Sequence, residues 1–532
     1  MADRVTATKS KITAIANAIR GKLSSQDTYT LDDMPNAIDS IGGGGSAVDI
    51  EDDVVFFDYD GEALKSYSKA EFMALSQMPD NPKATSHQGL EYKGWNWTLQ
   101  EAQTFVNECD MLDIGAMYES TEKNTTMDIE LKDGRLSPYL AITVNGTVTV
   151  DWGDGNQEDI TGTSASTTIR VLHEYEQEGE YIITISSEGD VYALGGASNE
   201  MRPLMKQNTG NYGNYDYVYM DAIKRVNFGE YASLSTTRQF MNCRNLEEIR
   251  MCSHADSVKT IPDNFCDGCY GLERMVISTD ITKIGGNAFN NCNSLNYITI
   301  PSNITELGAS SFTQTKRLKR MSISPNMTYK AGVFYGDSGI ERFFANQAFS
   351  GSGNVARECT QLKSAVFSSN VTQISSHCFH SDYSLKKIKL PHNNCSVAEY
   401  GFASCRALEE IDDNTLHGIQ GGLNAFDGCE NLRSIRLSTI DSISQAFLTG
   451  CKSLSSITIP NGALEISSSA FANCYGLGEV IFERPSPPTL ANSNVFSNLP
   501  TDCVIKVPRG SLTDYTSATN YPSSSTYTYE EY

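Results

Sequence analysis

The sequence predicts a multidomain, β-rich protein that ends in a solenoid of short coils. At 532 residues the chain is too long for one hydrophobic core. From about residue 222 onward, apolar residues recur in units of constant length, which is typical of repeat architectures. Ahead of the repeats, a glycine run and changes in hydrophobic pattern separate smaller segments. We expect N-terminal helices in an anchor segment (1–42), a Gly-rich linker (43–47), a small α/β domain (48–130), a β-sandwich (131–200), a linker (201–221), the solenoid (222–485), and a C-terminal cap and tail (486–532).

The repeated unit has the form Phe-x-x-Cys-x-x-Leu-x-x-Ile-x-Ile. A clear copy contains Phe289, Cys292, Leu295, Ile298 and Ile300, and eleven units can be aligned with spacings of 22 to 26 residues. We call the Cys position of the unit the ladder position. It is occupied by Cys243, Cys269, Cys292, Thr315, Asp337, Cys359, Asp382, Cys405, Cys429, Cys451 and Cys474.

The unit has the pattern of one solenoid coil. Its Ile-x-Ile end alternates as a short strand does, and the Phe-x-x-Cys part fits a turn of packed side chains. A single coil cannot cover its own apolar face, so successive coils must stack. Eleven coils at a strand spacing of ~4.8 Å would build a parallel sheet roughly 50 Å long. We expect the ladder cysteines to be reduced, buried thiols, because Cys is small and apolar.

The fourth to sixth units, around Ser324 to Glu358, are the least regular and are rich in aromatic residues. One interpretation is that these rings replace missing Leu and Ile side chains in the core. The other is an aromatic contact patch of the kind enriched in binding hot spots. The residues concerned are Tyr329, Phe334, Tyr335, Phe343, Phe344 and Phe349.

The segment Asn287–Leu295, followed by Ile298-Thr299-Ile300-Pro301, resembles the BspA-like leucine-rich repeats of bacterial surface proteins and some phage tail proteins. The resemblance covers roughly residues 222–485. The segment Val507–Leu512, with Tyr515, also looks like the closing segment of such arrays and would cap the last coil. This family is known for adhesion and protein recognition, so the resemblance implies a binding function.

Residues 10–41 look like the short leader of many tail proteins from phages of Gram-positive bacteria. Ile12, Ile15, Ile19 and Leu23 form one apolar helical stripe, and a second stripe runs from Leu31 to Ile41. Two helices this short need a partner to be stable. The resemblance implies an anchor that assembles with other tail proteins, with three copies favoured as in tail fibres. The alternative is a helical hairpin docked on the next domain.

The middle of the chain contains Asp151-Trp152-Gly153-Asp154-Gly155 after an alternating strand, and then Gly179–Ile185 as a second strand. This pattern resembles the polycystic-kidney-disease type of immunoglobulin-like β-sandwich, which implies a spacer. Asp151 and Asp154 could ligate calcium, but a turn of this composition forms without metal. The preceding segment 48–130 combines a strand-like stretch at Val54–Phe57 with helical stretches near 69–75 and 98–109.

Charge and hydropathy exclude several classes of partner. The formal net charge of −24 repels phosphate backbones, so we expect no nucleic acid partner. No apolar run is long enough to span a membrane, and the N-terminus lacks the apolar core of a secretory signal. We therefore expect synthesis in a cytoplasm without a signal peptide, and no membrane insertion.

Motifs that carry chemistry are weak in this sequence. Gly336-Asp337-Ser338-Gly339 is similar to the nucleophile loop of chymotrypsin-like proteases, but it lies inside a repeat. His377-Cys378-Phe379-His380 and Cys266-Asp267-Gly268-Cys269 lack the second ligand pair that zinc sites require. We expect no enzyme activity, no metal and no cofactor.

The leading hypothesis is a non-enzymatic receptor-binding protein of a phage tail or baseplate, located in the virion tail, whose solenoid binds a host cell-surface protein or glycan. The first alternative is a bacterial cell-surface adhesin. The second is an enzyme that cleaves cell-wall glycan with its 48–130 domain. Outward strand positions between two apolar residues are the expected receptor contacts. These are Arg250, Phe344, Lys389 and Arg436, together with Tyr335.

Overall fold

The computed structural model of the chain describes residues 48–51, 53–196, 202–206, 219–255, 257–336, 338–349, 353–391, 395–412, 419–437 and 441–532. The predicted anchor segment 1–42 and linker 43–47 lie outside the described residues, as does Asp337. Within the described ranges, no helix has the length and apolar character needed to cross a membrane.

The N-terminal domain (residues 53–120) combines a four-stranded sheet with two helices. The sheet has the order β2-β1-β4-β3, and only the central pair β1 and β4 is parallel. Both helices begin with a capping box, in which Ser68 and Thr98 each exchange hydrogen bonds with a glutamate three residues later. The elements are β1 (Val54–Phe57), β2 (Ala63–Tyr67), α3 (Lys69–Met73), β3 (Leu90–Trp95), α4 (Leu99–Cys109) and β4 (Leu112–Ser120).

The second domain (residues 125–206) consists of strands around a long hairpin of β6 and β7. Strand β5 pairs with β8 along its whole length, so the boundary between the two domains lies between residues 120 and 125 rather than at 130. Residues 204–205, expected in a linker, form a strand that pairs with β6. The strands are β5 (Thr125–Leu131), β6 (Tyr139–Asp151), β7 (Gln157–Leu172), β8 (Gly179–Ser186), β9 (Tyr192–Leu194) and β10 (Leu204–Met205).

Asp151 and Asp154, in the turn of the β6–β7 hairpin, bind neighbouring groups of the same hairpin. The Asp154 carboxylate contacts His173 Nε2 at 2.8 Å and accepts a hydrogen bond from the Asn156 amide. The His173 ring stacks on Trp152, which is buried. The Asp151 carboxylate accepts a hydrogen bond from Gly153 N, so both aspartates stabilise the turn in which they lie.

The second domain shares a sheet with the solenoid. Strand β5 is antiparallel to β11 (Ile223–Asn227), and β11 is parallel to the first coil strand β12. The short 3-10 helix η1 (Met220–Ala222) leads into β11. Because β5 occupies the edge that the first coil would otherwise expose, the second domain caps the N-terminal end of the stack.

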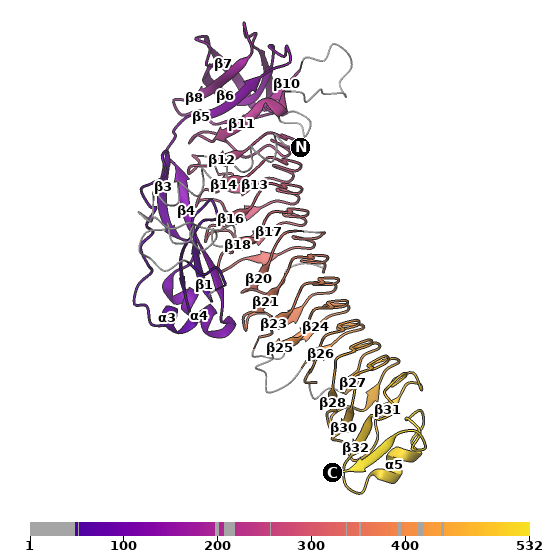
Figure 1. Cartoon of the computed structure of the whole chain (residues 1–532). Coiled ribbons are helices and arrows are strands. Elements are labelled where there is room, and N and C mark those ends of the chain that lie inside the picture. Colours follow the sequence, from indigo (N-terminus) through magenta and orange to yellow (C-terminus); the bar gives the residue numbers. More distant parts are fainter. Residues whose placement is uncertain are drawn as a thin grey trace, which may run out of the picture.

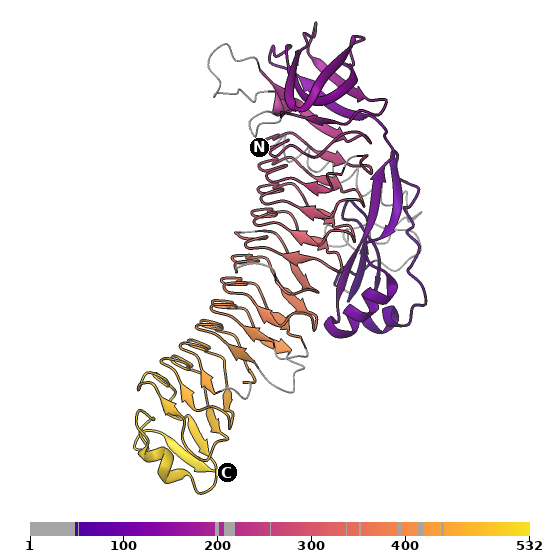
Figure 2. The same ribbon diagram turned by 180° about the vertical axis from the view of Figure 1, so that it is seen from behind.

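Each regular coil contributes one strand to a front column and one two-residue strand to a back column, and the paired strands are parallel (Figures 1 and 2). The front strands are β12 (Glu248–Arg250), β14 (Arg274–Val276), β16 (Tyr297–Thr299), β18 (Arg320–Ser322), β20 (Arg342–Ala345), β21 (Ser364–Phe367), β23 (Lys387–Lys389), β25 (Glu410–Asp412), β28 (Ser456–Ile459), β30 (Glu479–Phe482), β32 (Val504–Val507) and β33 (Thr528–Glu531). The back strands are β13 (Thr260–Ile261), β15 (Lys283–Ile284), β17 (Glu306–Leu307), β19 (Thr328–Tyr329), β22 (Gln373–Ile374), β24 (Ser396–Val397), β26 (Gln420–Gly421), β27 (Ser442–Ile443), β29 (Glu465–Ile466) and β31 (Thr489–Leu490).

The front column continues into the segment predicted as a cap. Strand β33 lies parallel to β32 near the end of the chain, and α5 (Leu512–Ser517) buries Tyr515 against the last coil. Residues 486–532 therefore extend the stack before they close it. The charged side chains Glu530 and Glu531 lie on the final edge strand, where charge discourages pairing with another chain.

The ladder cysteines bind the coil that precedes them. All fourteen cysteines lie in described residues, all are buried, and no disulfide joins them. The Sγ of Cys269 donates to Phe240 O at 3.0 Å, and the Sγ of Cys429 donates to Phe402 O at 3.2 Å. The same bond recurs at Cys292, Cys359, Cys405, Cys451 and Cys474.

Every residue that precedes a ladder position has a positive φ. Asparagine or glycine stands at most of these positions, for example Asn242, Asn291 and Gly428, because both tolerate the left-handed region. The backbone turn therefore depends on the residue beside the ladder as well as on the ladder side chain.

The aromatic residues of the irregular coils divide between core and surface. Tyr329, Phe334, Phe343 and Phe344 are buried, and Phe349 is partly buried against them. Tyr335, by contrast, is 37% exposed. The core interpretation therefore holds for most of these rings, and Tyr335 is the exception.

Asp382 occupies a ladder position with a carboxyl group that is completely buried. One oxygen accepts a hydrogen bond from Cys359 N at 2.7 Å, and the other has no hydrogen-bond partner among the described residues. Burial raises the pKa of Asp382 well above its ordinary value, because the charged form loses its hydration. A raised folded-state pKa means that stability falls as the pH rises from the unfolded-state value of about 3.9 through the folded-state value.

We predict that Asp382→Asn raises the midpoint of urea unfolding at pH 7 and has little effect near pH 3, where the wild-type carboxyl is protonated in both states. The expected gain at pH 7 is on the order of 1–3 kcal/mol, because a buried charge is removed and the acceptor for Cys359 N is kept. Asp502→Asn, at an exposed position, is the control. An equal gain at both pH values would contradict the assignment.

Candidate recognition surface

The N-terminal domain lies on the front strands of the solenoid and covers its first half (Figure 1). Strand β4 contacts β14, β16 and β18. Gly115 on β4 permits this approach, since a Cβ there would stand 2.4 Å from Thr299 Oγ1. Segments that are far apart in the sequence are thereby packed as one unit.

Buried polar side chains of the N-terminal domain bind the solenoid backbone. Asn96 Nδ2 donates to the carbonyls of Ile300, Ser322 and Ile323, and Trp97 Nε1 donates to Ile323 O at 2.7 Å. Asn96 is fully buried. Because the peptide groups would otherwise be left unsatisfied under the docked domain, these contacts favour one arrangement of the two parts.

A buried ion cluster lies at the centre of the contact. Asp113, on β4, is fully buried and stands 3.4 Å from a guanidinium nitrogen of Arg320 and of Arg342. Both arginines also donate to Ile50 O, and Glu51 lies within ion-pair distance of each. Removing Asp113 would leave two buried guanidinium groups without this partner, which is costly in a desolvated site.

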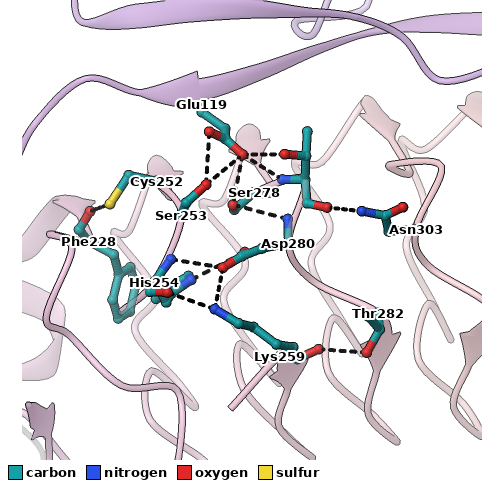
Figure 3. A network of polar contacts seen from close by, with 11 residues as sticks. Glu119, Phe228, Cys252, Ser253, His254, Lys259, Ser278, Asp280, Thr282 and Asn303 are labelled. Atoms are coloured by element: carbon teal, nitrogen blue, oxygen red, sulfur yellow. Dashed lines mark hydrogen bonds and ion pairs between the residues drawn. The ribbon is translucent and has the colours of Figure 1, made fainter. Parts of the chain in front are cut away.

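Glu119, at the end of β4, reaches into the loops of two coils (Figure 3). Its carboxylate accepts hydrogen bonds from Ser253 Oγ, Ser278 Oγ and Thr279 N, at 3.0–3.1 Å, and from Thr279 Oγ1. Burial alone would raise the pKa of Glu119, but these hydrogen bonds outweigh it and lower that pKa below its usual value. Glu119 therefore remains charged at the junction.

Asp280 extends the same network within the solenoid (Figure 3). It accepts hydrogen bonds from His254 N at 2.8 Å and Lys259 Nζ at 2.7 Å. Burial opposes the charged form of Asp280, yet hydrogen bonds from His254 and Lys259 hold its pKa well below the ordinary value. The loops that receive Glu119 are thus ordered by a second carboxylate.

Three of the expected receptor contacts are used by the N-terminal domain. Phe344 is 2% exposed and faces Phe105 with ring centroids 6.5 Å apart, and Lys389 is 8% exposed and pairs with Asp110. Arg250 Nη1 donates to Gln88 O at 3.1 Å. The alternation did place these side chains outward, but their interpretation as open receptor contacts is corrected, because the chain's own domain covers them.

The other two expected contacts remain on the surface. The side chain of Arg436 is exposed. The backbone of Arg436 is held in place, because its carbonyl oxygen accepts a hydrogen bond from Ile419 N at 2.8 Å. Tyr335 lies on the turns that follow the back strands, and the Arg357 guanidinium lies 5.8 Å from its ring centroid. We call these turns the turn edge. It lies on the side away from the N-terminal domain in both views (Figures 1 and 2).

The front strands beyond the N-terminal domain form an open face. On β28 and β30, the outward side chains Ser456, Thr458 and Ile481 alternate with buried residues. Lys506 on β32 pairs with Glu479 at 2.7 Å. This open front face, from β28 to β33, carries small, polar and apolar side chains on its outward side.

The described residues of the weak chemical motifs lie in the core or on the turn edge. Ser338 is buried and contacts Cys359 Sγ at 3.1 Å, so it is no exposed nucleophile. Cys378 points into the core, while His377 and His380 lie on the turn edge. Among the described residues, no group of three or more His, Cys, Asp or Glu side chains is arranged to hold a metal ion.

One Asp–His pair was missed by sequence reasoning. In the N-terminal domain, the buried Asp58 carboxylate contacts His87 Nε2 at 2.7 Å, between the rings of Tyr59 and Tyr118. The two residues are 29 positions apart in a loop-rich stretch, so no local motif indicates the contact. The rings of Tyr59 and Tyr118 therefore flank the imidazole of His87.

We predict that the contact between the N-terminal domain and the solenoid weakens in acid. Since the folded-state pKa of Glu119 is lowered, its stabilisation is complete above the unfolded-state pKa of about 4.3 and is lost as the pH falls through the folded-state value. Glu119→Gln should cost about 1–3 kcal/mol at pH 7 and flatten the dependence of the urea midpoint on pH below about 5. The exposed Glu122→Gln is the control. An unchanged pH profile in Glu119→Gln would contradict the prediction.

Comparison with known proteins identifies the repeats. The model of the BspA type leucine rich repeat region matches in six copies, over residues 235–353, 259–386 and 372–502. Together these ranges span residues 235–502, just over half of the chain. No curated protein matches the chain significantly.

Several solved structures share similarity with the chain at low sequence identity. A leucine-rich repeat protein from Bacteroides ovatus is 18% identical, with 65% of this chain and 97% of that chain covered and a TM-score of 0.43. A leucine rich cell surface protein from Faecalibacterium prausnitzii is 20% identical, with coverages of 61% and 93% and a TM-score of 0.33. The pneumococcal vaccine antigen PcpA is 14% identical, with coverages of 65% and 95% and a TM-score of 0.34.

The repeat match, the buried ladder and the parallel coils agree with one another. The chain belongs to the family of proteins with a BspA type leucine-rich repeat region.

Proposed function

We propose that the protein is a non-enzymatic adhesin that acts at a cell surface and uses its solenoid to bind a protein or glycan on another surface. The observation that carries the proposal is the BspA type repeat region, since adhesion and protein recognition are what the family resemblance implies. The surface that remains exposed along the solenoid supports it.

The docked N-terminal domain limits where a ligand can bind. It is joined to the front strands by Asn96, Asp113 and Glu119, all buried and all hydrogen-bonded or ion-paired. A ligand would have to break these contacts to reach the first half of the front face. Recognition therefore uses the open front face from β28 to β33, or the turn edge.

A second candidate is a receptor-binding protein of a phage tail or baseplate, favoured by the resemblance of residues 10–41 to tail-protein leaders. On this proposal residues 1–42 bind other tail proteins and assemble several copies, three being favoured. The chain would then lie in the virion tail, and the solenoid would bind a host cell-surface protein or glycan. The solenoid has the same recognition role in both proposals.

Location distinguishes the two proposals. With antibodies against the full chain, a surface adhesin is expected on intact cells that carry no phage genes. A tail protein is expected in purified particles and is released when the particles dissociate. Absence from both preparations would count against both proposals, whereas activity of the full chain on purified cell envelope would support the glycan-cleaving alternative.

We predict that Ile481→Arg on the open front face weakens binding of the full chain to susceptible cells by about tenfold or more, because a bulky charge is introduced into the contact. The matched control is Glu465→Arg, at an exposed position on a back strand. Binding would be measured by flow cytometry with labelled protein. Equal binding by wild type and Ile481→Arg would exclude this face and leave the turn edge.

A further inference from the structure

Coils five to eight carry a cluster of aromatic and basic side chains on the turn edge. We call it the Tyr–Arg patch. It consists of Tyr335, Arg357, His377, His380, Tyr383 and Arg406. These residues come from four successive coils, and none is part of the contact with the N-terminal domain described above.

The members of the patch contact one another across coils. The Arg406 guanidinium lies 5.2 Å from the centroid of the Tyr383 ring, just as Arg357 lies over Tyr335. His377 contacts His380 at 5.6 Å and stacks on Tyr400 at 4.8 Å. Tyr383 is 45% exposed, and the side chain of Arg406 is 63% exposed. The contacts therefore form three neighbouring pairs along the turn edge, and the pair of Tyr383 and Arg406 is open to solvent.

The equivalent positions in other coils show that the repeat does not require Arg357 or His380. The positions equivalent to Arg357 and His380 hold Asn290, Thr313 and Ala403. His377 and Tyr400 have φ values of 53° and 54°, at a position where Asn264, Asn287 and Asn424 stand elsewhere. Arg238, Ser310 and Ala446 adopt the same left-handed conformation at this position in other coils, so the turn accepts several residue types there.

The chemistry of the patch is that of a protein-binding hot spot. Tyrosine and arginine are the side chains enriched there. Arg406 pairs with Glu430 only at 3.9 Å, which is too long for a hydrogen bond, so its fork can meet a second carboxylate. Burial and the neighbouring Arg357 lower the pKa of His380, and its Nδ1 has no hydrogen-bond partner among the described residues.

The arrangement favours a peptide over a sugar. Guanidinium groups lie over the rings of Tyr335 and Tyr383, and His377 stacks on Tyr400, so several ring faces are already in contact. Stacking on a pyranose needs an open ring face, whereas hydroxyl groups, ring edges and guanidinium forks suit carboxylates and aromatic side chains.

We propose that the Tyr–Arg patch is a binding site for an acidic polypeptide segment that carries aromatic residues. This deepens the proposed function, on which it rests, by assigning one ligand class to the turn edge. The two guanidinium groups bind carboxylates, and the tyrosine and histidine rings contact the aromatic side chains. Glu358 lies 3.1 Å from Arg357 and Glu430 lies 3.9 Å from Arg406, so the acidic segment takes the place of these glutamates at the two guanidinium groups.

The test uses the full chain and a labelled random copolymer of glutamate and tyrosine as the probe, followed by fluorescence anisotropy at physiological salt. The double variant Arg357→Gln/Arg406→Gln should weaken binding at least tenfold. Controls are Arg244→Gln, Tyr270→Ala and Tyr475→Ala, which change exposed residues at the turn-edge position of Arg406 and Tyr383 in other coils. Tyr335→Ala/Tyr383→Ala should also weaken binding, and circular dichroism should show every variant folded.

Three results would overturn the proposal. These are absence of probe binding by the wild type, an equal loss in the control variants, and binding of polygalacturonate with the same dependence on Arg357 and Arg406. Failure here is distinguishable from failure of the proposed function. If the wild type binds cells but not the probe, recognition stands and the patch assignment fails; if it binds the probe but no cells, the patch stands and the adhesin proposal fails.

Discussion

The structure depends on one constraint, which is that a single coil of the solenoid cannot bury its own apolar face. Stacking at the spacing of parallel strands satisfies that constraint, and the position of each coil is then set by its contacts with the preceding coil. The thiols of Cys269 and Cys429 are examples of such contacts, since each donates a hydrogen bond to a carbonyl oxygen of the preceding coil. Both ends of the stack need another partner, and strand β5 and the β33–α5 segment supply it.

The docking of the N-terminal domain follows from the outward side of the same strands. A long parallel column offers a flat face on which a second sheet can pack, and Gly115 lets β4 approach it closely. Apolar contacts join the two parts, for example Phe57 with Tyr297. The polar side chains of Asn96, Asp113 and Glu119 add directional contacts that define the arrangement. Buried polar groups of this kind are costly when unsatisfied, so they favour one docked position over sliding along the column.

This arrangement divides the front strands of the solenoid into a covered part and an exposed part. The N-terminal domain covers the first half of the front face, while the open front face and the turn edge stay on the surface. The two surfaces differ in chemistry, because Ser456 and Thr458 are small and polar whereas the Tyr–Arg patch is aromatic and basic. On the proposed function, one stacked scaffold presents both surfaces, and preorganised contacts lower the entropic cost of binding.

The sequence by itself determined the repeat, the ladder and the inward or outward direction of strand residues, because these follow from a local period that every coil repeats. Ile249 and Arg250 alternate as expected, and the buried cysteines lie in the predicted register. Only the tertiary structure decided that Arg250, Phe344 and Lys389 are covered, that β5 belongs to the second domain, and that His377, Tyr383 and Arg406 meet on one edge. Those outcomes depend on contacts between segments of different coils or different domains. Such contacts are set by the packing of the folded chain, and no local sequence pattern predicts which segments will meet.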